Sequence, residues 1–465
     1  MIAMTLPEIA EVVGGAVHDD TGVTVTGAAF LDSRTVEPDG LFVALPGEHA
    51  DGHDFAAGAV AGGAAAVLAQ RPVGVPAVVV ADAATALSRL ARHVVERLEG
   101  TRVVGLTGSQ GKTGTKDLLA QILATAGPTV ATFGSFNNEL GLPLTVLRAT
   151  PDTEFLVLEM GARGIGHIRD LCAVARPDVG LVLNVGLAHV GEFGSREAIA
   201  QAKGELVEAL ESDGVAVLNA DDPLVLAMAS RTTARVSTYG EAAAADVRVE
   251  RLHLDDTGRP GFTLVTRDGT ADVTLRLLGE HQASNAAAAA AVALALGLGL
   301  DAVAAGLSAA TNASRWRMET RERADGVLVV NDAYNANPDS MRAALKTLAA
   351  LGRGRGPGAR TIAVLGEMRE LGASSREEHD AVGRLAVRLD IAQLVVVGEG
   401  ARPIHLGACL EGSWGEESVF VPDVDAATSW LREHVRPGDV VLVKASRAAA
   451  LERVAEALLE EDFGR

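Results

Sequence analysis

The sequence predicts an α/β protein of three domains: a small N-terminal α/β domain, a central domain with a mostly parallel sheet, and a C-terminal Rossmann-like domain. Apolar, β-branched runs alternate with helical segments along most of the chain, a pattern typical of parallel sheets with crossover helices. The length of 465 residues suits three domains of roughly 150 residues each. A glycine-rich turn at residues 105–114, between a strand-like run and a helix, predicts a phosphate-binding loop.

The composition limits the kinds of partner. Hydrophobic residues make up 48% of the chain, enough for a core in each domain. The formal net charge of −20 argues against broad contacts with nucleic acid or anionic lipid. The two cysteines, Cys172 and Cys409, suggest no disulfide framework. We find neither a signal-peptide pattern nor an apolar run of about 20 residues, so we expect a cytoplasmic protein without a membrane segment.

Residues 1–98 are expected to form the first domain. Thr5 and Glu8 have the spacing of a capping box, which predicts a helix through Val13. Further strands are expected at 23–25, 41–45, 65–68 and 77–80, and a closing helix at 84–98. The polar loops at 31–35 and 46–55 have the composition of a ligand site, although each one alone is typical of ordinary turns.

Residues 99–312 are expected to form the central domain. Its parallel strands are predicted at 103–107, 155–159, 179–185 and 215–219. The pattern then changes to antiparallel hairpins over 247–278, followed by an alanine-rich helix that starts near Gln282. Ligands of such sheets bind beyond the carboxyl ends of the strands, which selects Glu159 and the turns at 186–189 and 219–222.

Residues 313–465 are expected to form the third domain, again with alternating strands and helices. The strands are predicted at 327–330, 361–365, 394–397 and 440–443. The glycine- and arginine-rich stretch at 352–358 is interpreted as a flexible loop.

The turn at residues 105–114 has the chemistry of a phosphate loop. Small residues let successive backbone N–H groups surround an anion, and the N-terminus of the following helix adds partial positive charge. Lys112 can then reach the terminal phosphates, and the Thr113 hydroxyl can hold Mg²⁺. The complete pattern has a glycine where Leu106 stands, with Gly105 one place too early, so the loop is a shortened variant.

Three further residues are ambiguous when each is considered alone. Glu159 follows an apolar strand and suits a hard cation, but a glutamate at a strand end is often simply solvated. His189 follows the next strand and is a borderline Mg²⁺ ligand; considered alone, a histidine bonded to the backbone of a turn is the better interpretation. Lys203 looks like an ordinary lysine on a helix surface.

Together these stretches resemble the Mur ligase family over nearly the whole chain. The matching segments are 107–113, 159–162, 184–189, 202–205, 279–286, 317–319, 331–338 and 442–447. Each segment is a weak signal, whereas all of them in this order are a strong one. Two positions depart from the family pattern: Gln282 stands where asparagine is usual, and Ala445 where glycine is usual.

The resemblance implies an ATP-dependent ligase that joins a carboxylate to an amine through an acyl phosphate. Segments 135–144, 331–338 and 364–372 are most similar to the family member that adds D-alanyl-D-alanine to UDP-N-acetylmuramoyl-tripeptide in peptidoglycan precursor synthesis. Segments 32–34 and 41–47 are shared with the sister enzyme that adds a diamino acid as the third peptide residue. A folylpolyglutamate-type ligase, a phosphate-loop switch or motor and a simple nucleotide-binding module remain as alternatives.

The resemblance also implies roles for individual residues. The catalytic set is Lys112, Glu159, His189, Lys203 and Arg317. The ATP-binding set is Thr107, Gly108, Ser109, Gln110, Gly111, Lys112, Thr113, Asn285 for adenine, Arg317 for the γ-phosphate and Asp332 for the ribose. Two Mg²⁺ ions are expected on Thr113, Glu159, His189 and Lys203, with a CO₂-derived carbamate on Lys203.

The resemblance places the other substrates as well. Ser33 and Arg34 are expected to face the UDP part, and Asn137 and Asn138 the growing peptide. Lys444, Ser446 and Arg447 are expected near the incoming dipeptide. We expect a monomer that binds neither nucleic acid nor a membrane. The sequence does not distinguish diaminopimelate from lysine at the third peptide position.

Overall fold

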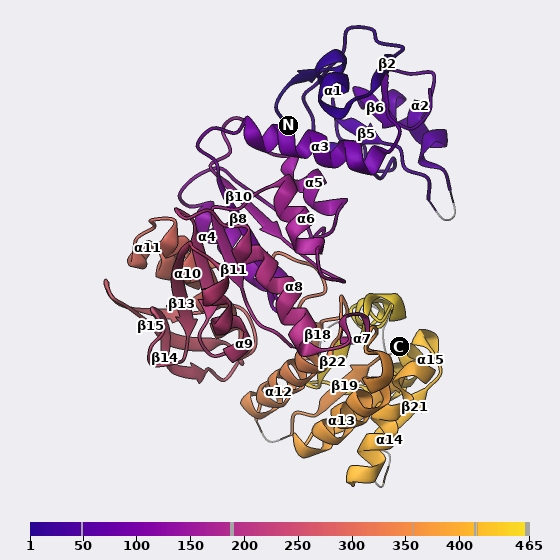
Figure 1. The fold of residues 1–465 in the computed structure, drawn as a ribbon. Helices are drawn as coiled ribbons and strands as arrows, with labels where there is room; N and C mark the ends of the chain where they lie inside the picture. The colour runs from indigo at the N-terminus through magenta and orange to yellow at the C-terminus, as the bar shows by residue number, and fades with distance from the viewer. Residues whose placement is uncertain (48–49, 187–189, 357, 413–414, 416, 461–465) are drawn as a thin grey trace.

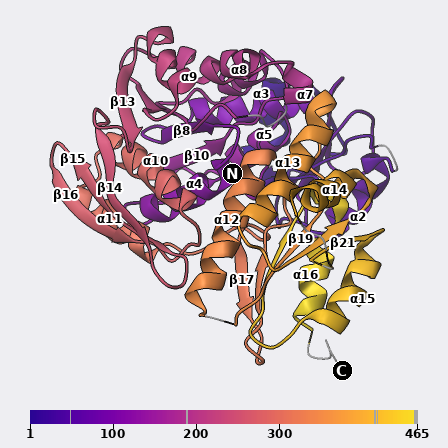
Figure 2. The same ribbon diagram turned by 90° about the horizontal axis from the view of Figure 1, so that it is seen from below.

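The computed structural model describes residues 1–47, 50–186, 190–356, 358–412, 415 and 417–460. Within these residues the chain forms three large sheets of five, nine and six strands, together with a two-stranded ribbon. The three sheets follow one another along the chain and lie in three bodies, which Figure 1 shows side by side. In Figure 2, seen from below, the C-terminal body lies in front of the N-terminal one. The predicted α/β class is therefore confirmed, and we propose domain boundaries near residues 98 and 312, in the connections between these sheets.

The N-terminal body contains the five-stranded sheet, in the order β2-β7-β6-β5-β4. Its elements are β1 (Met4–Thr5), α1 (Leu6–Val13), β2 (Ala16–His18), β3 (Thr24–Val25), β4 (Ala29–Phe30), β5 (Leu41–Val43), α2 (Ala56–Ala61), β6 (Ala66–Ala69), β7 (Ala77–Val79) and α3 (Ala83–Glu96). The capping box that starts α1 is confirmed: Thr5 accepts from the Glu8 amide and Glu8 accepts from the Thr5 amide. Strands β4 to β7 are parallel, and β2 pairs antiparallel at the edge.

The central body contains the nine-stranded sheet, in the order β16-β15-β14-β13-β12-β11-β8-β10-β9. Its strands are β8 (Arg102–Thr107), β9 (Thr129–Ala131), β10 (Phe155–Glu159), β11 (Val179–Val182), β12 (Val215–Asn219), β13 (Arg235–Gly240), β14 (Val247–Leu254), β15 (Pro260–Thr266) and β16 (Gly269–Thr274). Its helices are α4 (Lys112–Leu123), α5 (Gly141–Val146), α6 (His167–Val174), α7 (Val190–Phe193), α8 (Arg196–Glu208), α9 (Pro223–Leu226), α10 (His281–Ala295) and α11 (Leu300–Ala309). Pairing is parallel up to β14, and the predicted antiparallel hairpins are β14 to β16.

The alanine-rich helix α10 forms much of the central core. Its residues from Ala286 to Ala293 are all buried, so the helix presents apolar surface on every side. It packs against α4 and against strands β11 to β15. Because alanine is small, α10 can approach both neighbours closely and hold α4, which carries the phosphate loop at its N-terminus, against the sheet.

The C-terminal body contains the six-stranded sheet, in the order β17-β18-β22-β19-β20-β21. Its elements are β17 (Glu319–Glu322), β18 (Leu328–Asn331), α12 (Pro338–Gly354), β19 (Thr361–Leu365), α13 (Ser375–Arg388), β20 (Gln393–Val397), α14 (Arg402–Glu411), β21 (Ser418–Val421), α15 (Val424–His434), β22 (Val440–Lys444) and α16 (Glu452–Leu458). All neighbouring strands are parallel except β17 with β18. Among the described residues of the whole chain, no helix combines the length and the apolar character that a bilayer-spanning segment requires.

The prediction of a flexible loop at 352–358 is wrong for its first three residues, because α12 continues through Gly354. Both helical glycines lie where a side chain has no room. A Cβ on Gly354 would lie 1.7 Å from the backbone oxygen of Asp256, and a Cβ on Gly352 would lie 2.4 Å from Thr361 Cγ2. These glycines therefore let α12 pack closely against the β14–β15 turn of the central body and against β19.

Candidate active site

The three bodies meet around a cavity of about 1110 Å³. It lies at the carboxyl ends of β8 and β10, where an open α/β sheet binds its ligands. The N-terminal body contributes Thr85 and Ser88 of α3 to its wall. The predicted site residues on its wall are Ser109, Gln110, Gly111, Lys112, Thr113, Asn137, Asn138, Glu159, Lys203, Arg317, Ser446 and Arg447. Segments that are far apart in sequence thus share one cavity.

The phosphate loop connects β8 to α4. Gly111 has a φ of 79° at the start of the helix, a left-handed conformation that favours glycine. A Cβ on Gly108 would lie 2.8 Å from the Leu183 Cβ, so this glycine is needed for close packing. Thr107 is the last residue of β8 and is fully buried. The Lys112 ammonium donates to the Gly108 carbonyl at 2.7 Å, which folds it over its own loop.

Asn184 stabilises the loop from the neighbouring strand end. Its side-chain oxygen accepts from the backbone N–H groups of Ser109 and Gln110, at 3.0 Å each. The strand predicted at 179–185 is accordingly shorter, because β11 ends at Val182 and the chain turns toward the loop. No separate role for Asn184 was predicted from the sequence, although a side-chain amide at the polar end of an apolar run is a usable signal.

A carboxylate–hydroxyl–guanidinium network lies beside the loop. The buried Glu159 accepts from the Thr113 hydroxyl at 3.0 Å and from the Asn137 amide at 2.7 Å. Arg317 of the C-terminal body donates to the Thr113 hydroxyl at 3.3 Å and to the Ser135 hydroxyl at 3.2 Å. The structure thus brings together the predicted metal ligands Thr113 and Glu159 and the predicted phosphate ligand Arg317.

The two predicted peptide contacts differ in their surroundings. Asn137 bonds to Glu159, so it belongs to the network just described. Asn138 accepts from the Gly141 amide at 2.9 Å, which fixes the turn before α5. Because both residues also line the cavity, their predicted contacts with the peptide stay predictions.

Lys203 is a buried amine on the cavity wall. Its side chain comes from α8, and among the described residues it has no hydrogen-bond or ion-pair partner. Burial, and secondly the charge of Lys112, hold the pKa of Lys203 well below its ordinary value. Burial also lowers the pKa of Lys112. The interpretation of Lys203 as a surface lysine is therefore wrong. His189, its predicted neighbour at the metal site, lies outside the described residues.

A second cavity, of about 310 Å³, continues the site between the central and C-terminal bodies. Gly114 and Arg317 line both cavities. Gln282 lines the smaller one and accepts from the Asn285 amide at 3.0 Å. Asn285 lies behind it, close to Gly111, where a Cβ would be 2.6 Å from the Asn285 side-chain oxygen. The residue that departs from the family pattern, Gln282, thus lies at the wall itself.

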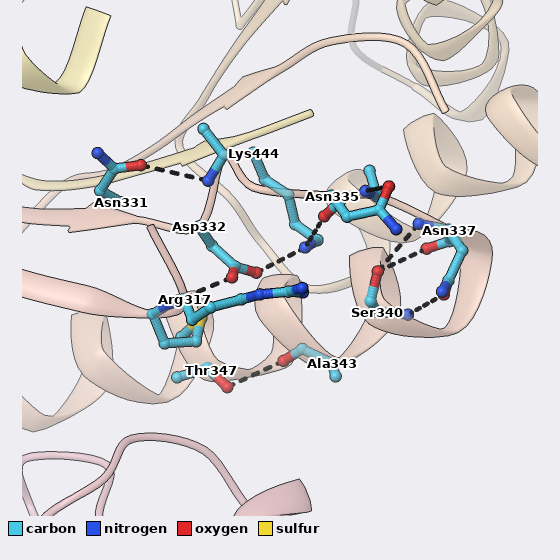
Figure 3. A network of polar contacts seen from close by, with 12 residues as sticks. Arg317, Asn331, Asp332, Asn335, Asn337, Ser340, Ala343, Thr347 and Lys444 are labelled. Carbon is cyan, nitrogen blue, oxygen red and sulfur yellow. Dashed lines mark hydrogen bonds and ion pairs between the residues drawn. The ribbon is translucent and has the colours of Figure 1, made fainter. Parts of the chain in front are cut away.

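The C-terminal body supports Arg317 through a second network (Figure 3). Asp332 accepts from the Lys444 ammonium at 2.6 Å and from the Met318 amide at 3.1 Å. Trp316 and Met318, on either side of Arg317, have positive φ angles of 58° and 51°, which are strained for side chains of this size. The Arg317 guanidinium lies 4.2 Å from the centre of the Tyr334 ring. Asp332 and Tyr334 therefore fix the strained segment from which Arg317 extends.

The predicted dipeptide contacts Lys444, Ser446 and Arg447 lie in the C-terminal body. Ser446 accepts from the Arg369 amide at 3.0 Å, and the Arg447 guanidinium lies 4.3 Å from the centre of the Trp316 ring. Lys444 is buried, donates also to the Asn335 carbonyl at 2.9 Å and lines neither cavity.

Ser33 and Arg34 lie in the N-terminal body and line neither cavity. Arg34 makes an ion pair with Asp32 at 2.7 Å, and this guanidinium lowers the pKa of Asp32 to about 2. A phosphate bound by Arg34 would therefore compete with a carboxylate that stays ionised.

The chemistry of the donors suits Mg²⁺, which prefers oxygen ligands and keeps water or phosphate in its shell. Thr113 and Glu159 place a hydroxyl and a carboxylate oxygen together beside the phosphate loop. In the part of the chain that the structure describes, no three His, Cys, Asp or Glu residues come together as a metal site. The fit of Mg²⁺ therefore depends on Thr113, Glu159 and the phosphates of the nucleotide.

Comparisons with known proteins agree with this geometry. Three Mur ligase family models match: the catalytic domain at residues 29–105, the middle domain at 106–293 and the glutamate ligase domain at 316–447. UDP-N-acetylmuramoyl-tripeptide–D-alanyl-D-alanine ligase of Mycobacterium tuberculosis is 51% identical, and that of Escherichia coli 38%, each over 99% of both chains. Among solved structures, MurF of Acinetobacter baumannii is 32% identical over 99% of both chains, with a TM-score of 0.86. MurF of Thermotoga maritima in complex with ADP is 32% identical over 94% of this chain and 98% of that chain, with a TM-score of 0.79.

Proposed function

This chain belongs to the Mur ligase family, and we propose that it joins D-alanyl-D-alanine to UDP-N-acetylmuramoyl-tripeptide with the conversion of ATP to ADP and phosphate. The observation that carries this proposal is the full-length identity of 51% to a curated ligase with that substrate pair. The ADP complex of the Thermotoga relative supports the use of ATP. The cavity supports the proposal, because all three bodies line it and it brings the predicted phosphate loop and the predicted peptide contacts Asn137 and Asn138 into one space.

The reaction has two steps. An oxygen of the tripeptide carboxylate attacks the γ-phosphorus of ATP, the bond to the β-phosphate oxygen breaks, and an acyl phosphate and ADP form. The amine of D-alanyl-D-alanine then adds to the acyl carbon and loses a proton. The tetrahedral intermediate expels phosphate, which leaves the new amide bond.

The first step brings two anions together, so positive charge is the main requirement of the site. We assign Lys112 and Arg317 to the β- and γ-phosphates. Lys112 belongs to the loop of the central body, and Arg317 reaches the same loop from the C-terminal body. We assign the loop amides of residues 107–113 to the phosphates, Gln282 and Asn285 to the adenine side, and Asp332 to the ribose. Asp332 is the least direct of these, because its carboxylate already accepts from Lys444 and from the Met318 amide.

Mg²⁺ would be held by Thr113 and Glu159, where it supplies positive charge to the phosphate oxygens. Asn137 orients Glu159 by donating to its other oxygen. We further propose that Lys203 carries a carbamate and, with His189, provides for a second Mg²⁺. A lysine reacts with CO₂ as the neutral amine, and the lowered pKa of Lys203 makes this form available closer to neutral pH.

The proposal for the other substrates follows the same resemblance. Ser33 and Arg34 would bind the UDP part, Asn137 and Asn138 the peptide, and Ser446 and Arg447 the incoming dipeptide. Lys444 would act on the dipeptide indirectly, since its ammonium is engaged by Asp332 and Asn335. We propose that the protein acts as a monomer, which sedimentation at micromolar concentration tests.

The test of the function is a phosphate-release assay with ATP, Mg²⁺ and UDP-N-acetylmuramoyl-tripeptide, with and without D-alanyl-D-alanine. We expect release that depends on both substrates and a pentapeptide product of the corresponding mass. Tripeptides that end in diaminopimelate or lysine, tested in parallel, identify the accepted third residue. Phosphate release that is indifferent to both substrates would contradict the proposal and indicate a switch or motor.

A further inference from the structure

Helix α6 has no side-chain cap of its own. It starts directly after the loop that follows Glu159, and its N-cap residue is Gly166, with a φ of 98°. A helix N-terminus leaves its first amides without partners unless a side chain accepts from them. In α6 that acceptor comes from another helix, since the carboxylate of Glu205 on α8 accepts from the Gly166 amide at 2.5 Å and from the Arg169 amide at 3.1 Å.

Glu205 is buried, and among the described residues no cation pairs with its carboxylate. Its charge is stabilised by the two amides and by the positive end of α6. Capping a helix in this way costs desolvation free energy, because a buried carboxylate must be compensated by hydrogen bonds or opposite charge. A serine at the N-cap achieves the same at the surface, as Ser195 does for α8 itself. The unusual feature is therefore the bond between the two helices.

A second charged side chain holds α8 through the backbone just before Lys203. The guanidinium of Arg231 donates to the carbonyls of Ala200 at 3.1 Å and Gln201 at 2.9 Å. Gly204 makes room for it, because a Cβ there would lie 1.9 Å from Arg231 Nη1. The helix is thus fixed just before and just after Lys203.

We propose that Glu205 and Arg231 form a clamp on α8 that positions Lys203 on the cavity wall. Glu205 connects α8 to α6, whose preceding loop begins at Glu159, so it couples the location of Lys203 to that of the predicted metal carboxylate. Arg231 prevents α8 from sliding along its axis. Neither residue lines the cavity, so both are positioning residues. The inference rests on the role of Lys203 in the proposed function.

The test compares Glu205→Gln, which keeps the shape of the side chain and loses its charge, with Glu197→Gln at an exposed position on the first turn of α8. We expect Glu205→Gln to fold, to keep its KM for ATP within about twofold and to lose kcat by about 10- to 100-fold, the loss that a misplaced reactive group produces. Glu197→Gln should match the wild type.

A second measurement is independent of turnover. Wild-type protein equilibrated with ¹³C-bicarbonate should show a carbamate resonance that is absent from Lys203→Ala, and Glu205→Gln should show it with reduced occupancy. A folded Glu205→Gln protein with wild-type kcat and wild-type labelling would overturn the inference. If Glu205→Gln fails to fold, Arg231→Gln replaces it, and unchanged kcat and labelling in that variant would overturn the inference equally.

The two proposals fail in different ways. A wild-type protein without ligase activity contradicts the proposed function, whereas the carbamate resonance and its dependence on Glu205 can still be measured. An active wild-type protein with an unaffected Glu205→Gln variant contradicts only the clamp.

Discussion

Lys112 is the residue whose role is simplest to isolate, because its ammonium bonds only to the Gly108 carbonyl among the described residues. Lys112→Ala should leave the fold intact and lower kcat/KM for ATP by at least about 100-fold, since a cation that neutralises phosphate charge is lost. The measurement is steady-state phosphate release, with circular dichroism to check the fold. Lys346→Ala, an exposed lysine on α12, is the control. Normal activity of Lys112→Ala would contradict the phosphate-loop assignment.

Lys203 allows a chemical test, because its proposed function belongs to a modified side chain. Lys203→Ala should lose nearly all turnover, and a short carboxylate such as formate should restore part of it by occupying the vacated space. The restored rate should saturate with formate concentration. Formate should have no effect on Lys112→Ala, which serves as the control. A Lys203→Ala variant with a near-normal rate would rule out the carbamate.

At the residue scale, the chemical roles of side chains could be predicted from the sequence more readily than their contacts and burial. Lys112, Thr113 and Glu159 could be proposed from their places beside strands, because the edge of a parallel sheet collects such side chains. The burial of Lys203 could not be predicted, because the local pattern is that of an ordinary helix, and the burial depends on how α8 packs against α6, β8 and β11. The same holds for Asn184, whose two bonds depend on a turn that begins earlier than the apolar pattern indicated.

At the element scale, glycines in α12 give the next prediction. Gly354→Ala should separate the helix from the β14–β15 turn, because the new Cβ would lie 1.7 Å from the Asp256 oxygen. We expect a loss of about 1–3 kcal/mol in the free energy of unfolding, the usual cost of overpacking. Urea denaturation measures it. Gly58→Ala in α2, where a Cβ meets nothing within 4 Å, is the control and should be neutral or slightly stabilising.

A Gly354→Ala variant of unchanged stability would show that this stretch behaves as the linker that its composition suggests. The sequence misled here because glycine and arginine enrichment marks loops and close helix packing alike. Elements with an unambiguous local signal were predicted well, among them α1 with its capping box and the strands β10, β12 and β19. Short edge strands such as β9 and β17 were missed, because pairing with a neighbour rather than their own composition makes them strands.

At the scale of the whole molecule, Arg317 joins the C-terminal body to the phosphate loop. Its guanidinium reaches Thr113 and Ser135 from a segment held in strained backbone conformations by Asp332. Strain of this kind costs free energy, and the contacts across the bodies offset it. Arg317 therefore contacts the central body directly, and in the proposed function it would also bring positive charge to the γ-phosphate of ATP.

Arg317→Lys separates the contact from the charge, because lysine keeps the positive charge but lacks the planar guanidinium, which donates to both hydroxyls through Nη2 and lies over the Tyr334 ring. We expect kcat to fall by about 100-fold and the radius of gyration of the ligand-free protein, measured by small-angle X-ray scattering, to increase. Arg321→Lys, an exposed arginine of β17, should change neither quantity. If kcat fell while the scattering stayed that of the wild type, Arg317 would act on the phosphate alone, and the contact between the bodies would depend on the packing of α12 on the β14–β15 turn instead.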